Sequence, residues 1–257
     1  ANRLKERSSA STALFLGYVY LIAFAGAYAL VIIQSPAYIG IVRSRLLIEL
    51  FGIGVFLYWW SYLPRPMLSA QAVWHRIHPF FLELALLAIA VTNVVEVPAQ
   101  WRPFTWALFS LALLGIATAW RIDKRLQMYS LVFYWVSVAN VAVIMTVYES
   151  PSQRWYDRPD IMSLFAIALQ ITYVAISHTR LLLSDISFPK GLGALSTLGA
   201  RVSANRNHWV YYPFFAALAL FLFWRFDRSV LTLLWATEAF VVFVLSALLR
   251  ENQFRYI

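Results

Sequence analysis

The 257 residues contain no cysteine and few charged side chains. The lack of cysteine excludes disulfides, thiolate nucleophiles and cysteine-ligated zinc or iron–sulfur sites from this sequence. Charged residues make up 13% of the chain, whereas a typical soluble domain carries about 25%. We also find no glycine-rich phosphate loop, no His-Glu-x-x-His and no Gly-x-Ser-x-Gly. The sequence therefore offers no known catalytic constellation, and we predict neither a cofactor nor a metal site.

Apolar residues dominate what is present. They form 61% of the chain, and the mean hydropathy is +0.67. A soluble chain of this length could not hide so much apolar surface in one core, but a bilayer accepts it as solvent. The 11 tryptophans fit a spanning protein as well, because amphipathic rings favour the boundary between water and lipid. The composition predicts an all-α, polytopic transmembrane bundle.

The apolar runs predict about eight membrane spans in a single membrane domain, residues 1–257. A helix needs about 20 mostly apolar residues to cross a bilayer. Loops rich in proline, aspartate, asparagine and arginine separate the runs, and none is long enough for a soluble domain. The runs are Ala13–Ile33, Leu46–Leu63, Pro79–Val97, Pro103–Trp120, Leu126–Tyr148, Ile161–Leu183, Trp209–Phe226 and Val230–Leu249.

The net charge of +9 comes from lysines and arginines that stand between the apolar runs. Nucleic acid is therefore not the expected partner, and anionic lipid headgroups are. If the N-terminus is cytoplasmic, the inner loops hold roughly twice as many basic residues as the outer ones, which favours both termini inside.

The longest loop, Ser184 to Asn207, is cytoplasmic in this topology. Its leucines and Val202 recur at near-helical spacing, which suggests an interfacial helix on anionic headgroups. Its three glycines favour a flexible loop instead, and the sequence leaves both alternatives open. The candidate headgroup contacts are Lys190, Arg201 and Arg206.

Two of the apolar runs share a short sequence similarity. Trp106-Ala107 precedes Arg121 by the same spacing with which Trp235-Ala236 precedes Arg250. The similarity raises the alternative of two parallel four-helix repeats, 13–120 and 126–249, as in membrane proteins that arose by duplication.

The segments Leu234–Ala239 and Leu249–Tyr256 resemble a recurring unit of a family of bacterial multi-pass membrane proteins, catalogued as domain of unknown function 2339. In that family, helices open with Trp-Ala-x-Glu-Ala and close with a basic cluster. The stretch from Trp106 to Arg121 is similar, with Phe109 where Glu238 would stand. The resemblance implies a bacterial cytoplasmic membrane, and it implies no activity. Because family members are longer, we expect the natural chain to extend past Ile257 or Ile257 to abut another helix.

Polar groups inside the expected spans are the best pointers to function. Glu238 lies about two turns inside the last run, so its carboxyl group should be protonated, paired or facing a polar cavity. Asn93, Asn140 and Gln170 are also deep, and such amides usually bond to neighbouring helices. Glu49 lies near a span end, where a carboxylate can reach headgroups or loop arginines.

Two functions are considered, and the lack of a catalytic constellation makes the first of them the leading hypothesis. The first is a non-enzymatic scaffold or accessory subunit packed against other membrane protein chains. The second is a transporter, or an enzyme acting on lipid-linked substrates, with Glu238, Gln170 and Asn140 lining a polar cavity. A cavity that reaches Glu238 favours the second function, and a dry, tightly packed Glu238 favours the first.

Overall fold

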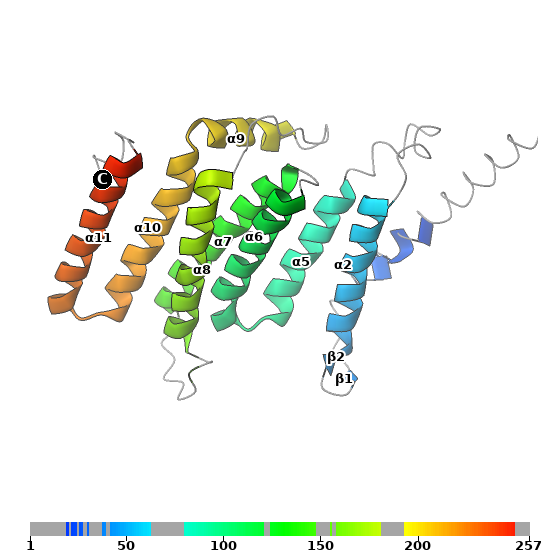
Figure 1. The fold of residues 1–257 in the computed structure, drawn as a ribbon. Helices are drawn as coiled ribbons and strands as arrows, with labels where there is room; N and C mark the ends of the chain where they lie inside the picture. Colours follow the sequence, from blue (N-terminus) through cyan, green and yellow to red (C-terminus); the bar gives the residue numbers. More distant parts are fainter. Residues whose placement is uncertain are drawn as a thin grey trace, which may run out of the picture. The chain divides into compact units, whose positions relative to one another are not determined.

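The computed structural model divides the chain into two compact units, Ala1–Glu96 and Val97–Ile257, which we describe separately (Figure 1). The described residues are 19–20, 22–24, 26–27, 30, 38–39, 42–62, 80–120, 124–147, 155, 158–180 and 193–249.

The first unit contains a short hairpin and two helices. Strand β1 (Tyr38–Ile39) pairs antiparallel with β2 (Val42–Arg43). Helix α2 (Ser44–Tyr62) follows at once and packs against α5 (Phe81–Glu96) through Ile53 and Ala88. Few charged residues interrupt either helix, so packing of apolar side chains is what joins them.

The second unit is helical throughout its described residues. A 3₁₀ turn, η2 (Ala99–Trp101), leads into α6 (Arg102–Trp120), which packs antiparallel against α7 (Arg125–Val147). Helices α8 (Pro159–Arg180) and α10 (Arg206–Arg225) complete the bundle, and α11 (Arg228–Leu249) packs principally on α10. Helix α9 (Gly193–Ala204) lies across one end of these helices (Figure 1).

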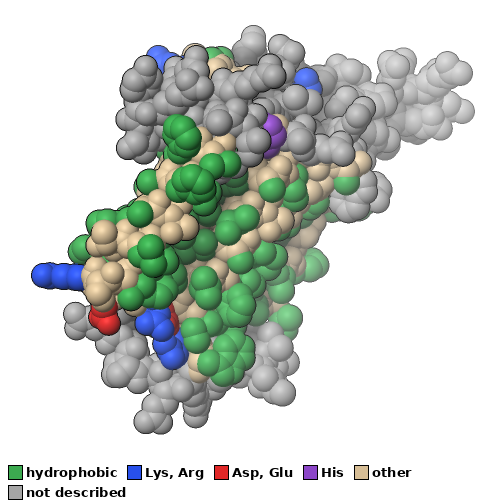
Figure 2. Space-filling view, turned by 60° about the vertical axis from the view of Figure 1, so that its left-hand side comes forward, with side chains coloured by type: hydrophobic (Ala, Val, Ile, Leu, Met, Phe, Trp, Pro, Cys, Tyr) green, Lys and Arg blue, Asp and Glu red, His purple; other side chains and the backbone are tan. Residues whose placement is uncertain are grey.

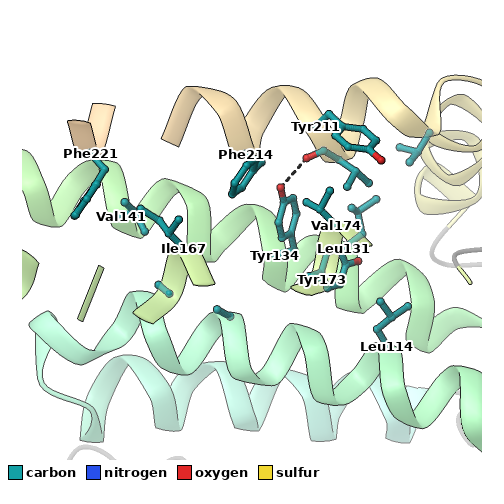
Figure 3. Close-up of a cluster of buried hydrophobic side chains, with 14 of the residues drawn as sticks. Leu114, Leu131, Tyr134, Val141, Ile167, Tyr173, Val174, Tyr211, Phe214 and Phe221 are labelled. Carbon is teal, nitrogen blue, oxygen red and sulfur yellow. Dashed lines mark hydrogen bonds between the residues drawn. The ribbon is translucent and has the colours of Figure 1, made fainter. Parts of the chain in front are cut away.

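Side chains mainly from α6, α7, α8 and α10, with Val202 of α9 and Val242 of α11, form the core of the second unit (Figure 3). Tyr134 on α7 and Tyr173 on α8 are fully buried, and their rings stack with centroids 4.6 Å apart. Both hydroxyls have partners, because Tyr134 donates to the carbonyl of Val210 at 2.6 Å and Tyr173 lies 3.1 Å from the Ser130 hydroxyl. The buried polar atoms of these rings therefore join helices rather than line a channel.

Pro213 interrupts the backbone hydrogen bonding of α10. Proline has no N–H, so it cannot donate to the carbonyl of Trp209, four residues earlier. The Trp135 indole on α7 donates to that carbonyl at 2.8 Å, and Tyr134 supplies the bond to the next carbonyl, that of Val210. Two adjacent aromatic donors on α7 thus serve the stretch of α10 that the proline disturbs.

Three helices in the described part of the chain are long and apolar enough to cross a membrane: Ala99–Ala119, Arg125–Val147 and Pro159–His178. Figure 2 shows a face whose middle is covered by hydrophobic side chains, with the visible charged groups towards its ends. On helix α11, for example, Leu233, Phe240 and Phe243 are each at least 60% exposed. These features indicate a membrane protein, in agreement with the predicted class.

Seven of the eight expected spans coincide with helices, from α2 to α11, with ends displaced by only a few residues. The first, Ala13–Ile33, lies largely outside the described residues, as does Ile257. The loop from Ser184 to Asn207 contains α9, so the helical alternative holds over Gly193–Ala204. The number of eight spans, the single membrane domain and the repeats 13–120 and 126–249 stay predictions. The contacts divide the chain into two units after Glu96.

Candidate functional site

Helix α11 presents a mixed stripe to α10. Leu231 and Val242 are buried, and Leu234 and Glu238 are half-buried, at positions that fall on one helical face. Three of the four are aliphatic, so Glu238 occupies a place where the pattern calls for an apolar residue. Its carboxyl group therefore faces the bundle and not the exposed side that carries Leu233 and Phe240.

A groove of about 530 Å³ opens between α8, α10 and α11 and reaches Glu238. This volume lies within the range of roughly 300–1,000 Å³ that holds small ligands. The groove is apolar apart from Glu238, Thr237 and Tyr211, and the Thr237 hydroxyl donates to the carbonyl of Leu233 at 2.8 Å. Its lining is Ile171, Val174, Ala175, Tyr211, Phe214, Phe215, Leu218, Leu222, Leu234, Thr237, Glu238 and Val241.

Helix α11 contacts the rest of the unit on both sides of Glu238: near the turn that joins it to α10, and at Val242, which is buried in the core cluster. The rings of Phe223 and Trp235 stack in parallel with centroids 6.1 Å apart. The Trp235 indole also donates to the carbonyl of Ala219, at a long 3.4 Å. Between these contacts, Glu238 and Val241 line the groove.

Gln170 and Asn140, which were predicted to share a polar cavity with Glu238, do not line the groove. Gln170 is fully buried and donates from Nε2 to the Ser137 hydroxyl at 2.9 Å, and Ser137 donates to the carbonyl of Pro103 at 2.8 Å. This chain of bonds joins α8, α7 and α6. Asn140 donates to the carbonyl of Val136 in its own helix at 2.8 Å. Neither amide lines the groove, so the expected polar cavity of three residues is replaced by an apolar groove with one carboxyl group.

The other candidates are scattered. Asn93 is buried on α5 in the first unit. Arg201 is exposed on α9, where Val202 and Leu198 pack on the core, so α9 has an apolar and a basic side. Arg206 is the first residue of α10, and Lys190 lies outside the described residues.

The burial of Glu49 and the hydrogen bonds donated by Tyr134 and Trp135 are not predicted from the sequence. Glu49, for which the sequence predicts contact with headgroups or loop arginines, is fully buried on α2. The aromatic donors Tyr134 and Trp135 were not singled out. Pro213 was the available signal, since a proline inside a span leaves a carbonyl that needs a donor.

Within the described residues, no three histidine, aspartate or glutamate side chains converge as metal ligands would. The chain matches no family model, no curated protein and no solved structure.

Proposed function

We propose that this chain is a polytopic membrane protein that binds a membrane-soluble, largely apolar ligand in the groove at Glu238. It would act as a transporter or on lipid-linked substrates. One observation carries the proposal: a cavity of ligand size reaches the one carboxyl group on the inward stripe of α11. A tightly packed scaffold helix would close over that position instead.

The proposal includes the topology of about eight spans with both termini on the cytoplasmic side of a bacterial membrane. The distribution of basic residues supports this orientation. The transverse α9, with Arg201 exposed and Val202 buried, supports an interfacial helix on anionic lipid on the same side.

Photocrosslinking tests the proposal. A diazirine-bearing aliphatic amino acid replaces Leu218, which lines the groove, or Leu233, which is 68% exposed on the far side of α11. We expect a defined small-molecule adduct at position 218 and a mixture of bulk phospholipids at position 233, read by mass spectrometry of the irradiated membrane. The same phospholipid mixture at both positions would contradict the proposal.

A second candidate, the non-enzymatic scaffold or accessory subunit, is favoured by the exposed apolar face of α11. Leu233, Phe240 and Phe243 offer another membrane protein a surface for helix packing. The same experiment separates the candidates, because a scaffold gives a protein adduct at position 233 and no small-molecule adduct at position 218.

A further inference from the structure

The carboxyl group of Glu238 has no protein partner within the described residues. Neither a hydrogen bond nor an ion pair is formed with it there. None of the twelve groove-lining residues carries a positive charge. A charged carboxylate that faces apolar side chains in a membrane is unfavourable without a counter-ion.

Helix α10 contributes three aromatic residues to the lining of the groove. Tyr211, Phe214 and Phe215 lie on consecutive turns of α10, and the rings of Tyr211 and Phe215 stack with centroids 6.5 Å apart. Aromatic faces attract cations through their quadrupole, most strongly where water is excluded. The lining therefore combines one carboxyl group with aromatic side chains of α10 and aliphatic side chains of α8 and α10, among them Val174, Ile171 and Leu218.

We propose that the groove binds a lipophilic cation, an organic ion of the ammonium or phosphonium kind. Its charge meets the Glu238 carboxylate and its apolar body lies against α8 and α10. Charge complementarity favours this occupant, because a cation lets Glu238 stay ionised in apolar surroundings, whereas a neutral acyl chain requires the carboxyl group to be protonated and an anion is repelled by a carboxylate. The inference rests on the proposed function, since it requires that the groove holds a ligand.

The test uses the full chain in nanodiscs of zwitterionic lipid, which limit adsorption of cations to the bilayer. Radiolabelled tetraphenylphosphonium is the probe, and tetraphenylborate has the same shape with the opposite charge. We expect saturable binding of tetraphenylphosphonium that tetraphenylborate does not displace. Glu238→Gln should weaken it at least about tenfold, because a desolvated ion pair loses one partner.

Three variants make the result specific. Glu96→Gln removes a carboxylate by the same change at the end of α5, outside the groove, and should leave binding intact. Leu218→Trp fills the groove without altering charge and should abolish binding. Glu238→Asp keeps the charge and should retain more binding than Glu238→Gln. Size-exclusion profiles and thermal unfolding establish that each variant is folded.

Equal binding by the wild-type protein and a folded Glu238→Gln variant would overturn the inference, as would displacement by tetraphenylborate. If Glu238→Gln does not fold, Leu218→Trp and Glu238→Asp decide the result. Absence of saturable cation binding would overturn the cation inference but not the proposed function, because a small-molecule adduct at position 218 would still support an apolar ligand. Absence of both results would overturn the proposed function as well.

Discussion

At the residue scale, the contact between α7 and Pro213 shows how a helix-breaking residue is accommodated. The Trp135 indole donates to the Trp209 carbonyl, which the proline leaves without its backbone donor. If α10 crosses the membrane as proposed, such a carbonyl cannot turn to water, and a neighbouring helix must supply the donor. The rings of Trp135 and Trp209 lie 5.4 Å apart, which holds the indole at this carbonyl.

We predict that Trp135→Phe lowers the free energy of unfolding by about 1 kcal/mol. Interhelical hydrogen bonds in membranes average about 0.6 kcal/mol and reach about 1.7, and this one satisfies an otherwise orphaned acceptor. Titration with sodium dodecyl sulfate, followed by circular dichroism, measures the change.

Two comparisons identify the cause. In a Pro213→Ala background, residue 213 regains its N–H, so the cost of Trp135→Phe should fall by at least half. Trp235→Phe removes an indole donor whose bond to Ala219 is long, 3.4 Å, and should cost less than Trp135→Phe. An unchanged cost in the Pro213→Ala background would show that the lost indole packing, and not the carbonyl, explains the effect.

The sequence shows Pro213 but not its partner. Tyr134 and Val210 are 76 residues apart, and no local pattern links a donor on one helix to a carbonyl on another. For the same reason the burial of Gln170 at Ser137 and that of Glu49 could not be read from apolar runs. Glu238 was identifiable from its depth alone, whereas the groove depends on how α8, α10 and α11 pack together.

At the scale of elements, one aspartate fastens the start of α8 to the end of α10. Asp160 binds Arg158 at 2.7 Å and Arg225 at 3.1 Å. The hydrogen bond to Asp160 and the charge of its carboxylate raise the pKa of the Arg158 guanidinium. Because Arg225 is the last residue of α10, this ion pair positions the end of α10 against the start of α8, and both helices line the groove.

We predict that Asp160→Asn destabilises the protein by about 0.5 kcal/mol at low salt and by less at 1 M salt. Arg225 is 49% exposed, and pairs of this kind are worth about 0–1 kcal/mol because solvent screens them. Thermal unfolding in detergent at the two salt concentrations measures the effect. Asp227→Asn is the matched control, since Asp227 forms no ion pair among the described residues. Equal, salt-independent losses in both variants would contradict the assignment.

Apolar run length was sufficient to predict the helices, because a run of about 20 residues without charge has few other solutions in a membrane. It was insufficient for the segment around α9. In that segment three glycines favour a loop and a weak apolar periodicity favours a helix. The helix forms where Val202 and Leu198 pack on the core of the second unit. Tertiary packing, which a local pattern does not contain, decided in favour of the helix.

At the scale of the whole molecule, the proposed topology makes α8 a crossing between two sides. Trp155, before α8, is 59% exposed, and Ala204 ends α9 after it. In the proposed orientation, residue 155 is outside and residue 204 is cytoplasmic. The chain contains no cysteine, so single cysteines can be introduced without removing others.

We predict that Trp155→Cys in intact cells reacts with a membrane-impermeant maleimide, and that Ala204→Cys reacts only after the membrane is permeabilised. Ala204 is exposed on the protein surface, so protection of this position would come from the bilayer and not from packing. The reverse pattern would invert the orientation and place both termini outside. Labelling of both positions in intact cells would mean that α8 does not cross, although it is long and apolar enough to do so. That outcome would also remove the groove at Glu238 from the membrane, because α8 supplies one of its walls.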